Sequence, residues 1–98
     1  MSANHKLTTI LAGRTVATVD HDVATAHLRL ADGATLTVKL GAGDFPAAPA
    51  LGRVKAVRQQ STTLNIDYDS AATLTLQTAE PTASVMLRAK DGTLEYAD

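Results

Sequence analysis

The chain has 98 residues, with nine Lys and Arg against ten Asp and Glu and a formal net charge of −1 at pH 7. This is the length of one domain, and the scattered, near-neutral charge excludes the strong phosphate attraction that marks nucleic-acid binders. No apolar run approaches the roughly 18 residues of a membrane span, and the first residues lack the basic-then-apolar order of a secretory signal. The absence of cysteine excludes disulfides, thiolate metal sites and cysteine nucleophiles. We expect a single cytoplasmic domain over residues 1–98 that binds neither nucleic acid nor membranes.

Residues 7–12 form the first segment with an apolar pattern. Leu7, Ile10 and Leu11 fit one face of a helical turn, whereas the run from Thr8 to Ile10 suits an edge strand. The sequence leaves helix and strand open here.

Residues 14–40 and 52–78 resemble two copies of one unit, because a shift of 38 positions aligns them without a gap. A chance match between segments rich in Ala, Thr and Leu is the alternative. The aligned positions are Val16 with Val54, Val19 with Val57, Thr25 with Thr63, Leu28 with Ile66, and Ala34–Thr37 with Ala72–Thr75.

Apolar residues alternate with polar ones along the later part of each unit, which predicts half-buried strands. The first strand of each unit differs, because its two valines are three positions apart. Such a strand either has both faces covered or contains a bulge that turns the second valine inward. The alternating apolar positions are Ala26, Leu28, Leu30, Leu36, Val38 and Leu40, then Leu64, Ile66, Tyr68, Leu74 and Leu76.

The length of each turn can be predicted, because residues directly opposite one another in an antiparallel pair must point to the same face of the sheet. A three-residue loop, residues 31–33, pairs Leu30 with Ala34 and places Gly33 where a left-handed conformation is needed. The equivalent loop, residues 69–71, has Ala71 at that position, which tolerates positive φ poorly, so we expect this loop to be relaxed or longer.

A C-terminal hairpin is predicted over residues 84–97. A two-residue turn of Asp91 and Gly92 would pair Leu87 with Tyr96 and Ala89 with Leu94, which keeps the apolar faces together.

The predicted fold is therefore all-β, a small antiparallel sandwich or barrel of about eight strands. It is built from two similar three-stranded meanders, packed face to face, plus the C-terminal hairpin. A connector rich in Gly and Pro, residues 41–51, joins the meanders. Its Phe45 is expected to plug one end of the core, with a ligand contact as the alternative.

Asp20, His21 and Asp22 are the sequence's weak candidates for metal ligands, because two carboxylates flank an imidazole. Adjacent residues on a strand diverge, however, and Gln59 and Gln60 occupy the corresponding place in the second unit. A solvated polar turn is the favoured interpretation. No catalytic residue and no cofactor are predicted.

The symmetry of the repeat could bring five arginines together on one surface, where they would bind an anion or an acidic partner. The favoured interpretation is that they lie dispersed on the surface. Arg14 and Arg53, together with Phe45 and Tyr68, are the candidate contacts for a ligand or partner. The five are Arg14, Arg29, Arg53, Arg58 and Arg88.

These observations favour a small, bacterial-type β protein without enzymatic activity that binds or assembles through protein–protein contacts. The segments Leu11–Val16 and Leu28–Gly33 resemble those of many small bacterial β proteins, which identifies no family. One alternative is a small-ligand-binding barrel gated by Phe45 and Tyr68, and a second is a metal-dependent enzyme that uses the turn at residues 20–22.

A two-fold homodimer would cover the neutral rows of outward threonines on a domain whose core is thin. Ordinary solvent-facing strand residues would give the same pattern. The sequence therefore leaves the homodimer and an unidentified protein partner open.

Overall fold

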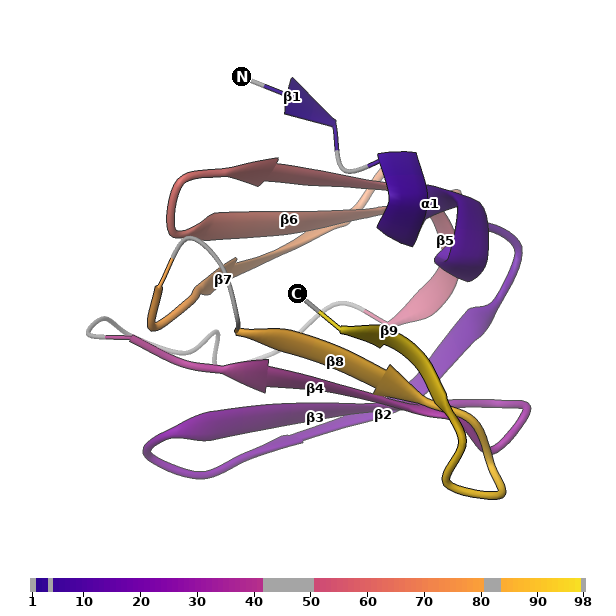
Figure 1. Cartoon of the computed structure of the whole chain (residues 1–98). Coiled ribbons are helices and arrows are strands. Elements are labelled where there is room, and N and C mark those ends of the chain that lie inside the picture. Colours follow the sequence, from indigo (N-terminus) through magenta and orange to yellow (C-terminus); the bar gives the residue numbers. More distant parts are fainter. Residues whose placement is uncertain (1, 4, 42–50, 81–83, 98) are drawn as a thin grey trace.

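Alternation of apolar and polar side chains places most of this chain in antiparallel strands (Figure 1). The computed structural model describes residues 2–3, 5–41, 51–80 and 84–97. The predicted all-β fold is confirmed, and the ambiguous segment at residues 7–12 belongs mainly to a short helix rather than a strand. In chain order the elements are β1 (Ser2–Ala3), α1 (His5–Leu11), β2 (Thr15–His21), β3 (Thr25–Leu30), β4 (Thr35–Lys39), β5 (Gly52–Gln60), β6 (Thr63–Tyr68), β7 (Thr73–Gln77), β8 (Val85–Arg88) and β9 (Leu94–Ala97).

The strands form one sheet in the order β7-β6-β5-β2-β3-β4-β8-β9, and β1 pairs with β5 off this path. The sheet folds over itself, so that β5, β6 and β7 lie above β2, β3, β4, β8 and β9 in Figure 1. Only two residue pairs, Thr15 with Arg53 and Val16 with Gly52, join β2 to β5. On the other side, within the described ranges, a single bridge links Leu40 to Thr78. The sheet therefore stays open and sandwich-like instead of closing into a barrel.

The first strand of each meander contains a bulge, which explains its unusual valine spacing. In β2 the pairing with β3 shifts between Val16 and Thr18, and in β5 the pairing with β6 shifts between Val54 and Ala56. Val54 and Val57 are both buried, at 1% and 0% exposure. The extra residue thus turns the second valine toward the core, as one of the two sequence-based alternatives predicted.

Equivalent strands and hydrogen bonds recur 38 residues apart. Strands β3 and β6 have this offset at both ends, and so do β4 and β7. The offset also relates the bond from Ala31 N to Thr15 O, 2.8 Å, to the bond from Asp69 N to Arg53 O, 2.9 Å. The two meanders therefore share one pattern of strand pairing.

The loop at residues 31–33 has the predicted length of three residues. The equivalent loop at residues 69–71 was predicted to be relaxed or longer, and this prediction is wrong. Leu30 N donates to Ala34 O at 2.8 Å, and Tyr68 N donates to Ala72 O at 2.9 Å, so both loops have three residues. Ala71 adopts a positive φ of 70°, where Gly33 has 95°. The sheet pairing on both sides holds the alanine in a conformation that its Cβ disfavours.

The C-terminal hairpin has a three-residue loop, so the predicted two-residue turn is wrong. Ala89 N donates to Thr93 O at 2.7 Å, and the Asp91 carboxylate accepts the Thr93 N–H at 2.9 Å. A bulge then brings Tyr96 opposite Leu87, as predicted, but leaves Leu94 opposite Arg88 and 48% exposed. The side-chain bond within the loop stabilises the longer turn.

The apolar core lies between the two layers and includes the alternating positions of both meanders. Leu28 and Ile66 are fully buried, and α1 adds Leu7 and Leu11 at one open end. Phe45, which was expected to plug the core, lies outside the described residues, as does most of the connector at residues 41–51. Within the described ranges, no helix is long and apolar enough to cross a bilayer.

The two equivalent loops should respond in opposite ways to substitution at their last residue. Gly33→Ala should lower the free energy of unfolding by about 1–2 kcal/mol, because a Cβ at φ 95° is strained and would lie 2.8 Å from the Lys90 side chain. Ala71→Gly should cost nothing and gain up to about 1 kcal/mol, since relief of strain offsets the added chain entropy. Urea unfolding measures both, and a clear loss of stability in Ala71→Gly would contradict this account of the loop.

Candidate functional site

The polar side chains of the turn at residues 20–22 form hydrogen bonds and an ion pair with other groups of the same chain. Asp22 Oδ1 accepts the N–H groups of Ala24 and Thr25, both at 2.8 Å, and these bonds lower the pKa of Asp22. Asp20 lies 3.3 Å from the Arg29 guanidinium, and the His21 ring lies 3.3 Å from the Asp22 carbonyl. In the described part of the chain, no three His, Asp or Glu side chains lie close enough to hold a metal ion together.

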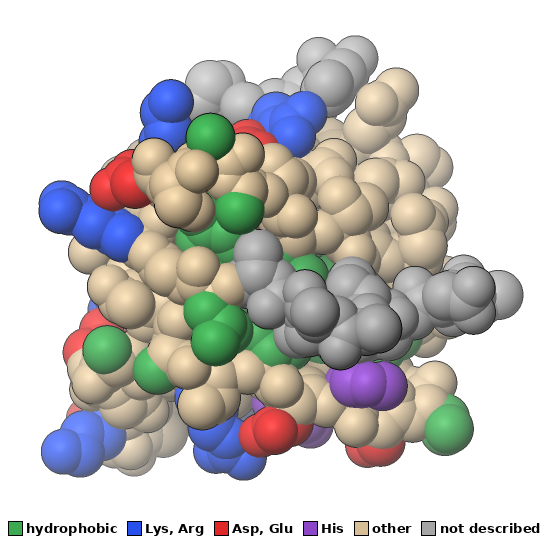
Figure 2. All heavy atoms as spheres, turned by 180° about the vertical axis from the view of Figure 1, so that it is seen from behind, with side chains coloured by type: hydrophobic (Ala, Val, Ile, Leu, Met, Phe, Trp, Pro, Cys, Tyr) green, Lys and Arg blue, Asp and Glu red, His purple; other side chains and the backbone are tan. Residues whose placement is uncertain are grey.

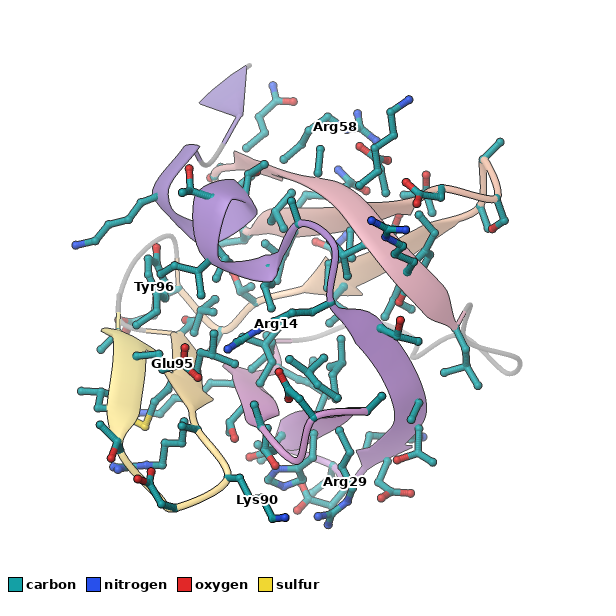
Figure 3. The ribbon with its side chains drawn as sticks, turned by 90° about the vertical axis from the view of Figure 1, so that its right-hand side faces the viewer. Arg14, Arg29, Arg58, Lys90, Glu95 and Tyr96 are labelled. Carbon is teal, nitrogen blue, oxygen red and sulfur yellow. The ribbon has the colours of Figure 1, made fainter. Side chains whose placement is uncertain are left out.

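The five arginines do not converge, and Figure 3 shows Arg14, Arg29 and Arg58 at separate levels of the fold. Arg14 has the most extensive contacts, with Nε 3.2 Å from Asp32 and a second nitrogen 3.0 Å from Glu95. This pairing ties the start of β2 to the β3–β4 loop and to β9. The other contacts are Arg29 with Asp20, Arg53 with Asp69 at 3.5 Å, Arg58 with Asp67, and Arg88 with the Gly92 carbonyl.

Tyr68, a candidate ligand contact, belongs to the core. The residue is 1% exposed, and its hydroxyl has no hydrogen-bond partner among the described residues. Burial raises the pKa of Tyr68 to about 12. The structure therefore places this side chain among the core residues rather than at an open mouth.

The outward face of β5, β6 and β7 carries an ordered network of polar side chains. The Arg58 guanidinium donates to both Asp67 oxygens, at 2.7 and 2.9 Å, and Thr73 Oγ1 donates to the same carboxylate at 2.8 Å. Beside them, Thr75 Oγ1 donates to Asn65 at 2.6 Å. These two hydroxyls of β7 thus bond to side chains of β6, in addition to the backbone pairing of the two strands.

An open hollow of about 230 Å³ lies on this face, near the end of β7 that follows the loop at residues 69–71. It is lined by Lys55, Ala56, Asp67, Tyr68, Ala71, Ala72 and Thr73, and the buried candidate contact Tyr68 is thus one of its lining residues. The Arg58 hydrogen bonds lower the pKa of Asp67 most, and Thr73 and Lys55 add to the effect. Asp67 is therefore an anion that is already paired.

The outer edge of β7 has backbone groups that no other strand of the described ranges pairs with. Residues of an antiparallel strand point their backbone groups alternately toward one neighbour and the other. Since Tyr68 and Ala72 form a hydrogen-bonded pair, Leu74 and Leu76 bond to β6, and Thr73, Thr75 and Gln77 face away. Gln77 O accepts the Gly41 N–H at 2.9 Å. Within the described ranges no strand pairs with Thr73 and Thr75, and both residues are exposed.

Strand β7 also lacks the features that usually block an edge. Its sequence, TLTLQ, contains no charge, proline or glycine, and its pairing with β6 has no bulge. The strand at the other end of the sheet, β9, has a bulge in its pairing and contains Glu95, which is bonded to Arg14. In Figure 2 charged side chains lie mainly along the left and lower rims. The described atoms at the upper right of this view are uncharged.

The sequence predicted the outward threonines of this face but not the open edge. A strand's neighbours depend on the order of strands in the sheet. The alternating pattern of TLTLQ fits a central strand as well as an edge strand, so it does not predict which of the two it forms. Comparison of the chain with protein-family models, with curated proteins and with solved structures found no match.

The Asp67 carboxylate should stabilise the fold in a pH-dependent way. Its pKa is lowered in the folded state, so the stability it adds is present above its unfolded pKa, near 4, and is lost as the pH falls through the folded value. The difference in unfolding free energy between the natural chain and Asp67→Asn should therefore be constant from pH 7 to about pH 5 and shrink at lower pH. Urea titrations across this range measure it. A difference that stays constant down to pH 2 would contradict this role. Asp20→Asn, which removes the more exposed carboxylate of the equivalent ion pair in the first meander, is the control for one lost charge.

Proposed function

We propose that this protein is a non-enzymatic binding or assembly module that pairs with other chains by strand addition at the open edge of β7. The observation that carries the proposal is the pair of outward-facing backbone positions at Thr73 and Thr75. Strand addition uses main-chain hydrogen bonds for affinity and alternate side chains for specificity. The edge offers both on a strand that its neighbour already holds extended.

Strand β8 supports the proposal, because it occupies the equivalent edge of the first meander. It pairs with β4 through Thr35 with Arg88, Leu36 with Leu87, and Thr37 with Met86. Since β4 and β7 are 38 residues apart, the positions that correspond to this edge are Thr73, Leu74 and Thr75. An added strand on β7 would therefore repeat a contact that the fold makes once within itself.

The shared pairing pattern also supports the repeat as part of the proposal. In this proposal, residues 14–40 and 52–78 are two copies of one unit. The C-terminal hairpin at residues 84–97 covers the edge of the first copy alone. The second copy keeps its edge for a partner. The cysteine-free chain favours the cytoplasm as the place where this happens.

Removing one backbone donor at the edge should separate binding from folding. Thr75→Pro loses an N–H that faces away from β6, so the fold should persist, since proline is tolerated on edge strands in that orientation. Association with any partner should weaken about tenfold or more, because a main-chain hydrogen bond is lost and the pyrrolidine ring obstructs pairing. Thr75→Val, which keeps the N–H, is the matched control.

Two measurements test this together: sedimentation of the purified chain over a concentration series, and capture by the immobilised chain from cell extract. The proposal requires an association that Thr75→Val retains and Thr75→Pro loses. It fails if every association is equal in the two variants, or if the chain neither self-associates nor captures a partner.

A further inference from the structure

We infer that the hollow on the outward face of β5, β6 and β7 binds a glutamate side chain of a partner protein, whose carboxylate pairs with Lys55. The residues that border the hollow come from β5, from the end of β6, and from the loop and strand start at residues 71–73. The site therefore lies across the face of the sheet, and it does not require that the edge of β7 accept a strand. The inference goes beyond the proposed function by naming the chemistry of a second contact.

The hollow is suited to one side chain rather than to a whole ligand. Its volume of about 230 Å³ is below the roughly 300–1,000 Å³ of pockets that bind drug-sized molecules. Ala56, Ala71 and Ala72 contribute short apolar groups, against which the methylene groups of a side chain can pack. Lys55 and Asp67 contribute charged groups. This lining fits a side chain with an apolar stem and a polar end.

The equivalent place in the first meander already holds a long side chain. Gly33 corresponds to Ala71, and the two residues end equivalent loops with φ of 95° and 70°. A Cβ on Gly33 would lie 2.8 Å from Cγ, 2.9 Å from Cδ and 3.0 Å from Cβ of Lys90, which extends from the loop of the C-terminal hairpin (Figure 3). The stem of Lys90 thus occupies the space beside Gly33, whereas Ala71 borders the hollow. The fold therefore accommodates a long side chain from another segment at this place.

The charge around the two places differs, so the occupants should differ in charge as well. Lys55 stands where the first meander has Ala17, which adds a cation beside the hollow. Ser70 stands where the first meander has Asp32, which removes a carboxylate from the loop. A lysine like Lys90 would meet a cation here, and an acidic side chain would meet an attractive charge.

The carboxylates near the hollow are already paired, and Lys55 is not. Arg58 donates to both oxygens of Asp67, and Asp69 lies 3.5 Å from Arg53. Within the described ranges, Lys55 forms no hydrogen bond or ion pair. The charge that remains for a ligand is therefore positive, and it favours a carboxylate over an ammonium group.

The bulge in β5 positions this lysine. Val54 pairs with Tyr68 and Ala56 pairs with Asp67, so Lys55 is the extra residue between them. A bulge changes the direction of a side chain while the strand on either side stays paired. Lys55 is thus attached to a backbone that is fixed at both ends. Because Lys90 places three stem carbons beside Gly33, the longer acidic side chain, glutamate, is the better match.

Blocked tripeptides of sequence Ala-Glu-Ala, Ala-Gln-Ala and Ala-Lys-Ala can test the inference, with the amide chemical shifts of the protein as the readout. The Glu peptide should shift the amides of Lys55, Ala56 and Ala71 with a dissociation constant in the millimolar range, since one side chain provides few contacts. The Gln and Lys peptides should bind at least about threefold more weakly, because neither carries a carboxylate.

Three variants separate the hollow from general attraction to a positive surface. Lys55→Gln should weaken binding of the Glu peptide by about threefold to fivefold, the range for an exposed ion pair. Lys39→Gln removes another exposed strand lysine and is the matched control, with unchanged affinity expected. Ala56→Leu keeps Lys55 but fills the hollow, so binding should weaken by a similar factor. Unchanged amide shifts away from the hollow establish that each variant is folded.

Three results would overturn the inference: equal affinity for the three peptides, equal losses in Lys55→Gln and Lys39→Gln, or no shifts at the hollow with about 20 mM Glu peptide, well above the expected dissociation constant. Acetate tests the stem. If acetate binds as tightly as the Glu peptide, the site holds a small anion and not a side chain. The proposed strand addition would survive each of these results, because Thr75→Pro and Thr75→Val test it separately.

Discussion

Satisfying the backbone groups at strand edges is the constraint around which this fold is organised. The edge of β5 is covered in three parts: by β2 at Gly52 and Arg53, by the Thr8 hydroxyl, which bonds both the N–H and the carbonyl of Val57, and by β1. The edge of β4 is covered by β8 and then by Thr78. The helix, the first residues and the C-terminal hairpin of this chain thus cover strand edges. Within the described ranges, no strand covers the edge of β7 at Thr73 and Thr75.

The two meanders share backbone pairing but differ in the side chains that face solvent. Asp20 and Arg29 form an outward diagonal ion pair in the first, and Arg58 and Asp67 form the equivalent pair in the second with the charges exchanged. The second pair is shorter and less exposed, and it holds the Thr73 hydroxyl as well. The polar network therefore orders the strand whose edge is open, which reduces the conformational entropy that a binding partner would have to overcome.

Local signals in the sequence predicted much of the fold. Alternation identified the strands, valines three apart indicated either a bulge or two covered faces in the first strand of each meander, and Gly33 marked a three-residue turn. The errors were also local: Ala71 was expected to relax its loop, and Asp91 with Gly92 was expected to make a shorter turn, although the surrounding pairing decides both. The Thr8 bonds to β5 and the ion pair between Arg14 and Glu95 join residues 49 and 81 positions apart, and no local pattern encodes them. For the candidate site, the outward threonines were predictable, whereas the open edge depends on strand order.

The most direct test of the central claim, that the β7 edge is open and able to pair, is amide hydrogen exchange resolved by residue in dilute and concentrated protein. In dilute solution the N–H groups of Thr73 and Thr75 should exchange rapidly, and those of Leu74 and Leu76, bonded to β6, slowly. At high concentration, protection should appear at Thr73 and Thr75. Slow exchange of Thr73 and Thr75 in dilute solution, or exchange that concentration and added partner leave unchanged, would contradict the account.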